Sequence, residues 1–152
     1  MLQLENDPEI WPVSQTVEAF TRDEIASFIV DNNHDLFLET QLRYIIVLSK
    51  NNIQIGCIDL FNYDAKKNNA GVGITLLKQF RGKKYSVKSL QLLIDIVFNT
   101  LKLNELYCNI FTNNIASIKL FESVGFDRIK LLKANTEYMD VKYDEYFYIL
   151  KK

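Results

Sequence analysis

Hydrophobic and polar residues alternate in several short segments of the chain, which is the pattern of β-strands with one buried face. The clearest alternation covers residues 72–76, where Val72, Ile74 and Leu76 are separated by Gly73 and Thr75. The same pattern predicts further strands at Arg43–Ser49, Ile53–Tyr63, Glu105–Phe111, Phe126–Leu132 and Glu145–Leu150. Polar residues 50–52 join the first two of these as a hairpin, and the last two are typical of a closing antiparallel pair.

Helical periodicity follows the central strand over residues 84–101. One stripe is polar: Lys84, Lys88, Gln91, Asp95 and Asn99. The remaining positions are mostly apolar: Val87, Leu90, Leu93, Ile94, Val97, Phe98 and Leu101. This pattern predicts a long helix with most of its surface buried. A shorter helix is predicted from Asn113-Asn114 onward, with Gly125 as its C′ residue and four side chains pointing inward: Ile115, Ile118, Phe121 and Val124.

The first 20 residues open on what reads as the tail of a helix, after which Pro8 and Pro12 predict a loop. Trp11 in this loop is either the wall of a pocket or a packing anchor. Thr21 and Glu24 then form a capping box. It predicts a helix with Ile25, Phe28 and Ile29 on one face, ending at Asn32-Asn33. Residues 35–41 fit a short helix or a loop.

This order of elements predicts one mixed sheet with helices on both faces, an α/β fold in a single domain spanning residues 1–152. The length of 152 residues and an apolar fraction of 48% are sufficient for one hydrophobic core. The net charge of −1 provides no basic field for nucleic acid. The sequence shows no signal peptide and no membrane-spanning run, so we expect a cytoplasmic protein without a membrane partner.

Few side chains suit metal or thiol chemistry. Cys57 and Cys108 lie in strand-like apolar segments, which predicts two buried, reduced thiols. His34 is the single histidine, so a site built from several histidines is excluded, and its polar neighbours place it in a loop. We therefore expect no bound metal.

The segment 77–86 joins the central strand to the long helix through a basic turn that contains Gly82. Unpaired backbone N–H groups at a helix start, together with the helix dipole, favour an anion such as a pyrophosphate. An ordinary strand–turn–helix connection has the same spacing, so the spacing alone leaves both interpretations open.

Two sequence blocks resemble the GNAT superfamily of acyl-CoA-dependent N-acetyltransferases. The run QFRGKK resembles its Q/R-x-x-G-x-G/A signature, with Gln79 and Gly82 matching and Lys84 in place of the second small residue. The run NNIASIKLFESVGF resembles its N-x-x-S-x-x-L-Y-x-x-x-G-F block. In this second run Phe121 replaces the usual tyrosine, and the matching residues are Asn114, Ser117, Leu120, Gly125 and Phe126. The chain is most similar to the diamine or polyamine branch and the ribosomal-protein branch.

The resemblance implies acetyl-CoA as co-substrate, held where the central strand separates from the 105–111 strand. The implied acetyl-CoA-binding residues are Ile74, Thr75, Leu76, Gln79, Arg81, Gly82, Lys83, Lys84, Tyr85, Ser86, Asn114, Ser117 and Phe121. A side chain at Lys84 would cost about 1–2 kcal/mol if this position had a positive φ. We expect a helical Lys84 instead, because it continues the polar stripe.

The reacting amine must lose a proton, and a carboxylate is the expected base. Asp59, Asp35 and Glu39 are the candidates. Asp59 interrupts an apolar strand, so it either pairs with Arg43 or faces the pocket. Phe121 lies at the position of the family's tyrosine acid and lacks the hydroxyl. The tyrosines that could substitute for this acid are Tyr85, Tyr138, Tyr143 and Tyr148.

Three functions follow from this resemblance. The first is acetylation of a small diamine or polyamine, the second is acetylation of a protein N-terminus, and the third is acyl-CoA binding without catalysis. Relatives of these branches carry a further strand before the residues that correspond to the start of this sequence. We therefore expect that the family's first strand is missing and that the edge of the 43–49 strand is uncovered. Either the chain then forms a homodimer or higher oligomer through this edge, or its true start lies upstream of the given sequence.

Overall fold

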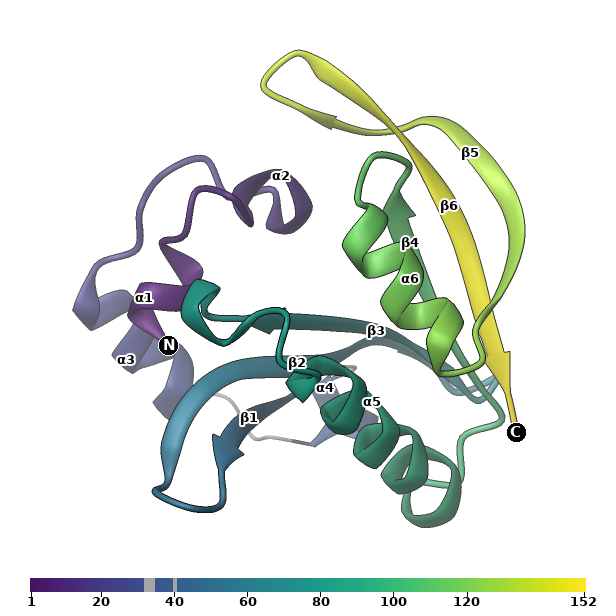
Figure 1. Cartoon of the computed structure of the whole chain (residues 1–152), viewed down its shortest axis with the longest axis horizontal. Coiled ribbons are helices and arrows are strands. Elements are labelled where there is room, and N and C mark those ends of the chain that lie inside the picture. Colours follow the sequence, from purple (N-terminus) through teal and green to yellow (C-terminus); the bar gives the residue numbers. More distant parts are fainter. Residues whose placement is uncertain (32–34, 40) are drawn as a thin grey trace.

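A computed structural model describes residues 1–31, 35–39 and 41–152 (Figure 1). The predictions for Asn32, Asn33 and His34 lie outside the described residues. The helices are α1 (Leu2–Glu5), α2 (Trp11–Ser14), α3 (Arg22–Asp31), α4 (Leu36–Glu39), α5 (Tyr85–Asp95) and α6 (Ile115–Ser123). A 3₁₀ turn η1 (Lys78–Phe80) precedes α5, and a π-helical segment η2 (Ile96–Thr100) follows it. The strands are β1 (Leu42–Leu48), β2 (Ile53–Asp64), β3 (Asn69–Leu76), β4 (Glu105–Phe111), β5 (Asp127–Tyr138) and β6 (Val141–Lys151).

These strands form one six-stranded sheet in the order β1-β2-β3-β4-β6-β5. All neighbours are antiparallel except β3 and β4, which are parallel. The β3–β4 ladder is short: it pairs Asn69 with Glu105, Ala70 with Leu106 and Gly71 with Tyr107, and it does not continue beyond them. The carboxyl half of β3 therefore separates from β4, as the resemblance implies, and the mixed α/β sheet is confirmed.

The two faces of the sheet are covered by different helices (Figure 1). On one face α4, α5 and α6 bury apolar side chains together with β2 and β4, including Leu36, Leu90, Phe121 and Leu60. On the other face α1 packs near Ile45 and Cys57. Burial raises the pKa of Cys57 to about 12 and also raises the pKa of Cys108, so both thiols are protonated at neutral pH.

The N-terminal segment contacts the sheet through buried Leu4 and through ion pairs, without strand pairing. Arg43 forms an ion pair with Glu5 and two hydrogen bonds to Asp59, at 2.6 and 3.0 Å. The predicted capping box is confirmed: Glu24 accepts the Thr21 N–H at 2.7 Å, and the Thr21 hydroxyl accepts the Glu24 N–H at 3.3 Å. Among the described helices, none is long and apolar enough to cross a bilayer.

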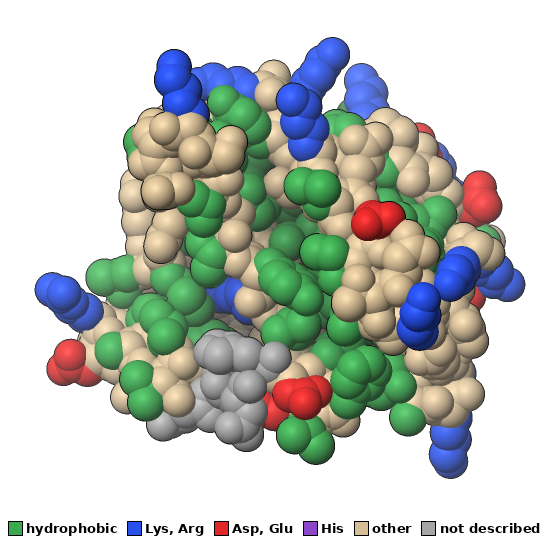
Figure 2. All heavy atoms as spheres, turned by 90° about the horizontal axis from the view of Figure 1, so that it is seen from below, with side chains coloured by type: hydrophobic (Ala, Val, Ile, Leu, Met, Phe, Trp, Pro, Cys, Tyr) green, Lys and Arg blue, Asp and Glu red, His purple; other side chains and the backbone are tan. Residues whose placement is uncertain are grey.

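Exposed apolar side chains concentrate on α3, α4 and β1. They include Phe28, Ile29, Val30, Phe37, Leu38, Ile45 and Val47. The view from below in Figure 2 shows hydrophobic side chains gathered across the centre of this side, with lysine and arginine side chains at its rim. Strand β1 pairs only with β2 within the described chain, so its other edge has no strand beside it, as expected.

Several predicted details were wrong. Pro12 lies within α2 rather than in a loop, at a position near the helix start where proline is tolerated. Ile115 is exposed instead of buried, because α6 turns this first residue away from the sheet. Strands β5 and β6 extend well beyond the predicted ends and form a long hairpin that projects from the sheet (Figure 1).

Candidate functional site

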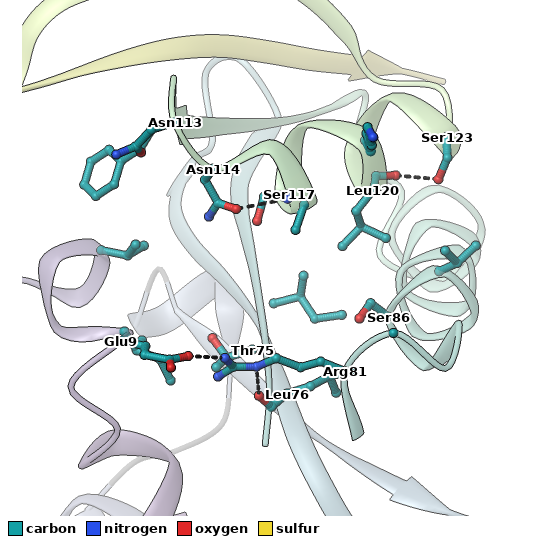
Figure 3. Close-up of a pocket in the computed structure, with 18 of the residues that line it drawn as sticks. Glu9, Thr75, Leu76, Arg81, Ser86, Asn113, Asn114, Ser117, Leu120 and Ser123 are labelled. Carbon is teal, nitrogen blue, oxygen red and sulfur yellow. Dashed lines mark hydrogen bonds and ion pairs between the residues drawn. The ribbon is translucent and has the colours of Figure 1, made fainter. Parts of the chain in front are cut away.

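A cleft of about 1130 Å³ opens where β3 separates from β4 (Figure 3). Five parts of the chain line it: the N-terminal segment, the end of β3, the turn before α5, one side of α6, and the β4–β6 pair. The lining residues from β3, the turn and the start of α5 are Ile74, Thr75, Leu76, Arg81, Gly82, Lys84, Ser86 and Val87. Those from β4, α6 and β6 are Phe111, Asn113, Asn114, Ala116, Ser117, Lys119, Leu120, Ser123 and Tyr143.

The turn between β3 and α5 depends on two residues with left-handed backbone conformation. Gly82 has a φ of +74°, and no atom lies within 4 Å of the position a β-carbon would take. Lys84, the N-cap residue of α5, has a φ of +62° and a ψ of +10°. The prediction that Lys84 is helical was therefore wrong. Lysine thus stands at a position whose backbone conformation favours glycine.

The side chain of Arg81 binds the N-terminal segment rather than pointing freely into the turn. Its Nε donates to the Leu76 carbonyl at 2.9 Å, while its Nη atoms contact Glu9 at 2.6 Å and Asp7 at 2.9 Å. Lys78 also binds Glu9, at 2.5 Å. The hydrogen bond from Lys78, followed by that from Arg81, lowers the pKa of the Glu9 carboxyl. Arg81 lines the cleft, but its guanidinium is already paired with Glu9 and Asp7. The lysines that line the cleft are Lys84 and Lys119.

The start of α6 forms the opposite wall of the cleft. Asn114 is its N-cap, and the Asn114 side chain accepts the Ser117 N–H at 3.1 Å (Figure 3). Gly125 follows the helix with a φ of +98°. The N-x-x-S motif therefore caps the helix. Its two residues, Asn114 and Ser117, also line the cleft, as does Leu120.

The three candidate bases do not lie in the cleft. Asp59 pairs with Arg43 and does not face the cleft, so the first of the two roles considered for it is the one that the structure shows. Asp35 accepts the N–H of Phe37 at 2.8 Å and caps α4. Glu39 lies at the end of the same short helix and is not among the residues that line the cleft.

Phe121, at the family's tyrosine position, belongs to the hydrophobic core. Its side chain is 4% exposed, and its ring meets that of Phe126 edge to face at 5.0 Å. It does not line the cleft as described.

Of the four tyrosines considered as substitutes, Tyr143 alone lines the cleft, and it stacks on Phe111 with ring centroids 4.6 Å apart. Tyr138 donates its hydroxyl to the Thr16 carbonyl at 2.8 Å, and Tyr148 donates its hydroxyl to Glu122 at 2.9 Å. The ring of Tyr85 packs near Phe80 at 6.5 Å.

Three predicted turn residues lie outside the lining. Gln79 belongs to η1, Tyr85 begins α5, and the Lys83 ammonium lies 5.8 Å from the Phe80 ring centroid. Trp11 donates its indole N–H to the Glu5 carbonyl at 3.0 Å, which fits a packing anchor rather than a pocket wall.

The sequence offered the loop around Trp11 as a possible pocket wall, but it did not identify the residues of this segment that line the cleft, which are Glu9, Ile10, Pro12 and Val13. Long-range ion pairs to Arg81 and Lys78 fix the segment, and such pairs leave no local signal. Lys119 and Ser123 were also missed. Ser123 lies three residues after Leu120 of the motif, a spacing that places it on the same side of α6, whereas Lys119 has no such spacing from Asn114 or Ser117. Within the described ranges, no three His, Cys, Asp or Glu side chains gather as a metal site would require.

Comparison with known proteins agrees with this geometry. A family model described as an acetyltransferase (GNAT) domain matches residues 1–127. The chain belongs to the GNAT acetyltransferase family. It is 28% identical over 153 residues to the uncharacterized N-acetyltransferase p20 of Bacillus licheniformis, covering 100% of this chain and 85% of that protein.

Solved GNAT structures share the fold at low sequence identity. The spermidine N-acetyltransferase of Vibrio cholerae, in complex with CoA and spermine, aligns with a TM-score of 0.86 at 18% identity, covering 98% of this chain and 86% of that one. A putative ribosomal-protein-serine acetyltransferase of Vibrio cholerae aligns with a TM-score of 0.74 at 18% identity, covering 92% and 80%. At such identities the likeness establishes the fold, and the substrate must be argued from the cleft.

Proposed function

We propose that this GNAT protein transfers an acetyl group from acetyl-CoA to a primary amine, with a small diamine or polyamine as the acceptor. The observation that carries the proposal is one cleft lined both by the turn before α5 and by the open half of β3, with Phe111 and Tyr143 among its other lining residues. The V. cholerae spermidine N-acetyltransferase with the same fold is in complex with CoA and spermine.

The turn and the start of α5 provide the anion-binding half of this proposal. Backbone N–H groups from Gly82 to Ser86 are the unpaired donors of a helix start, and they are suited to a pyrophosphate. Lys84 and Lys119 add positive charge from two walls of the cleft.

The gap beside β3 provides the reaction half. Residues 74–76 have β2 on one side and no paired strand on the other, so backbone groups on that side can hold an extended substrate arm. Acetyl-CoA supplies the acetyl thioester. In the transfer, a C–N bond forms to the amine, the C–S bond breaks, and the amine proton passes to solvent or to the leaving thiolate.

Removing that proton is the larger energetic demand. An amine with a pKa of about 10.4 is about 3.4 units above neutrality, which amounts to roughly 4.6 kcal/mol at pH 7. The leaving thiol has an ordinary pKa of about 8.5, so a general acid adds little. Phe121 in place of tyrosine is therefore compatible with turnover, and we expect the rate to rise with pH as the free amine forms.

Release of CoA with a panel of acceptors tests this proposal. We expect turnover with putrescine, spermidine or spermine above the rate without any amine, and less with a peptide that has a free N-terminus. The reverse order would favour acetylation of a protein N-terminus; the second V. cholerae neighbour is described as a putative ribosomal-protein-serine acetyltransferase. If no acceptor raises the rate while acetyl-CoA still binds, the chain is a binding module and the proposed enzyme function is wrong.

A further inference from the structure

One buried carboxylate lies beside the cleft, next to two residues that line it, and is not itself a lining residue. Glu145 on β6 is 6% exposed, and no other charged residue among those described is buried. Its two oxygens accept hydrogen bonds from neutral donors, the Asn135 amide at 2.5 Å and the Thr136 hydroxyl at 2.9 Å. Within the described part of the chain, no cation pairs with it.

The sheet places Glu145 on the face that carries the end of the cleft. Tyr143 lies two residues earlier on β6, and side chains two apart on a strand share a face. Phe111 lies directly opposite Glu145 in the antiparallel β4–β6 register, and opposed side chains share a face as well. Both of these neighbours line the cleft and stack on each other. Glu145 thus lies next to the aromatic stack at the Tyr143 end.

This arrangement differs from that of Glu9, the acidic side chain among the described lining residues. Glu9 is already bound by Lys78 and Arg81, so its charge is compensated within the protein. An ionised carboxylate that is buried without a cation is costly, and a bound cation would remove that cost. The faces of Tyr143 and Phe111 favour a cation too, through cation–π attraction.

We propose that Glu145, together with the aromatic faces of Phe111 and Tyr143, binds the non-reacting ammonium group of a diamine or polyamine acceptor. This inference rests on the proposed function and adds the group that selects the acceptor. The reacting amine has to lose its positive charge before it attacks, so a carboxylate that recognises an ammonium group acts on the other amine. The second amine stays charged throughout and is the group that Glu145 recognises.

Two amines of equal carbon length separate this role from a structural one. Putrescine carries a second ammonium, and butylamine does not. Putrescine has two reactive ends, which alone doubles its kcat/KM. Beyond this factor of two, we expect the parent to have a kcat/KM about tenfold higher or more for putrescine than for butylamine, because a hydrogen bond between charged groups is stronger than one between neutral groups.

The Glu145→Gln variant removes the charge and keeps the length of the side chain. We expect its putrescine-to-butylamine ratio to fall by about tenfold while the KM for acetyl-CoA stays unchanged. Asp144→Asn is the matched control: Asp144 is adjacent and exposed, and its carboxylate accepts the Ala134 N–H at 2.8 Å. Because neighbouring strand residues point to opposite faces, this control should leave the ratio within about twofold of the parent.

The outcomes separate the two proposals. If neither amine raises the parent's rate of CoA release above the rate without amine, the proposed function fails. If the parent turns over both amines without preferring putrescine, the role of Glu145 is refuted, and this result requires no variant to fold. If a folded Glu145→Gln protein keeps the parent's ratio, the role is refuted as well. A ratio that falls in Glu145→Gln and not in Asp144→Asn supports it.

Discussion

Replacement of Lys84 by glycine should stabilise the protein. Lys84 has a φ of +62° at the N-cap of α5, a conformation that costs an L-residue about 1–2 kcal/mol. Glycine removes this cost but gives the unfolded chain more freedom, which takes back about 0.4–1 kcal/mol. The expected net gain is about 0.5–1 kcal/mol, or about 1–4 °C in melting temperature for a chain of this length.

Lys84→Ala is the control for the loss of charge. Alanine also removes the ammonium group but retains the β-carbon that makes a positive φ costly. We therefore expect Lys84→Gly to be more stable than Lys84→Ala by about 1 kcal/mol, while Lys84→Ala resembles the parent. Urea unfolding of all three proteins measures this difference, provided that the m-values agree.

The affinity for acetyl-CoA should respond differently from stability. Both substitutions remove the same lysine from the cleft, so both should weaken acetyl-CoA binding by a similar factor. If Lys84→Ala proves as stable as Lys84→Gly, the strain assigned to this turn is absent and the reasoning is refuted.

Three further predictions concern the core, the N-terminal wall and the sheet edge. Phe121→Tyr buries a hydroxyl beside Phe126, so we expect a loss of about 1–3 kcal/mol of unfolding free energy, with turnover within about twofold; increased turnover at unchanged stability would contradict this placement. The pKa of Glu9 is lowered in the folded protein, so the ionised carboxylate stabilises the fold above the ordinary pKa of 4.5. This stabilisation is lost as the pH falls through the lowered pKa of the folded state. The melting temperature of the parent should therefore exceed that of Glu9→Gln at pH 7, and a gap that persists undiminished well below pH 4.5 would contradict this. The unpaired edge of β1 should make the protein self-associate in sedimentation experiments, whereas a monomer whose β1 amides resist hydrogen exchange would show that the edge is covered.

The sequence predicts the fold best where the pattern is local. The strand Glu105–Phe111 has its predicted bounds, because apolar residues alternate along it and polar residues flank it. The β1–β2 hairpin is within one residue of its predicted ends for the same reason. The outer halves of β5 and β6 lack this signal. They are mostly polar, and a register shift between Leu132 and Thr136 interrupts their pairing.

The sequence predicted those parts of the candidate site that depend on local backbone geometry, and it missed those that depend on long-range contacts. The two motifs identify the turn and the start of α6, since both depend on local backbone geometry around Gly82 and Asn114. Helical periodicity wrongly included Lys84 in the helix, because the polar stripe of α5 extends to this residue although it is the left-handed N-cap. Contacts such as Arg81 with Asp7, or Glu145 beside Phe111, join distant segments and leave no trace in local patterns.

The most direct test of the central claim is the melting temperature of the parent and of Gly82→Pro at increasing acetyl-CoA concentration. A ligand at 100 times its Kd stabilises the folded state by about 2.7 kcal/mol, so the parent should gain several degrees in a saturable way. Proline fixes φ near −65°, which is incompatible with the +74° of Gly82, so a folded Gly82→Pro protein should lose most of this gain. No gain for the parent at millimolar acetyl-CoA would contradict the assignment of this cleft as an acyl-CoA site.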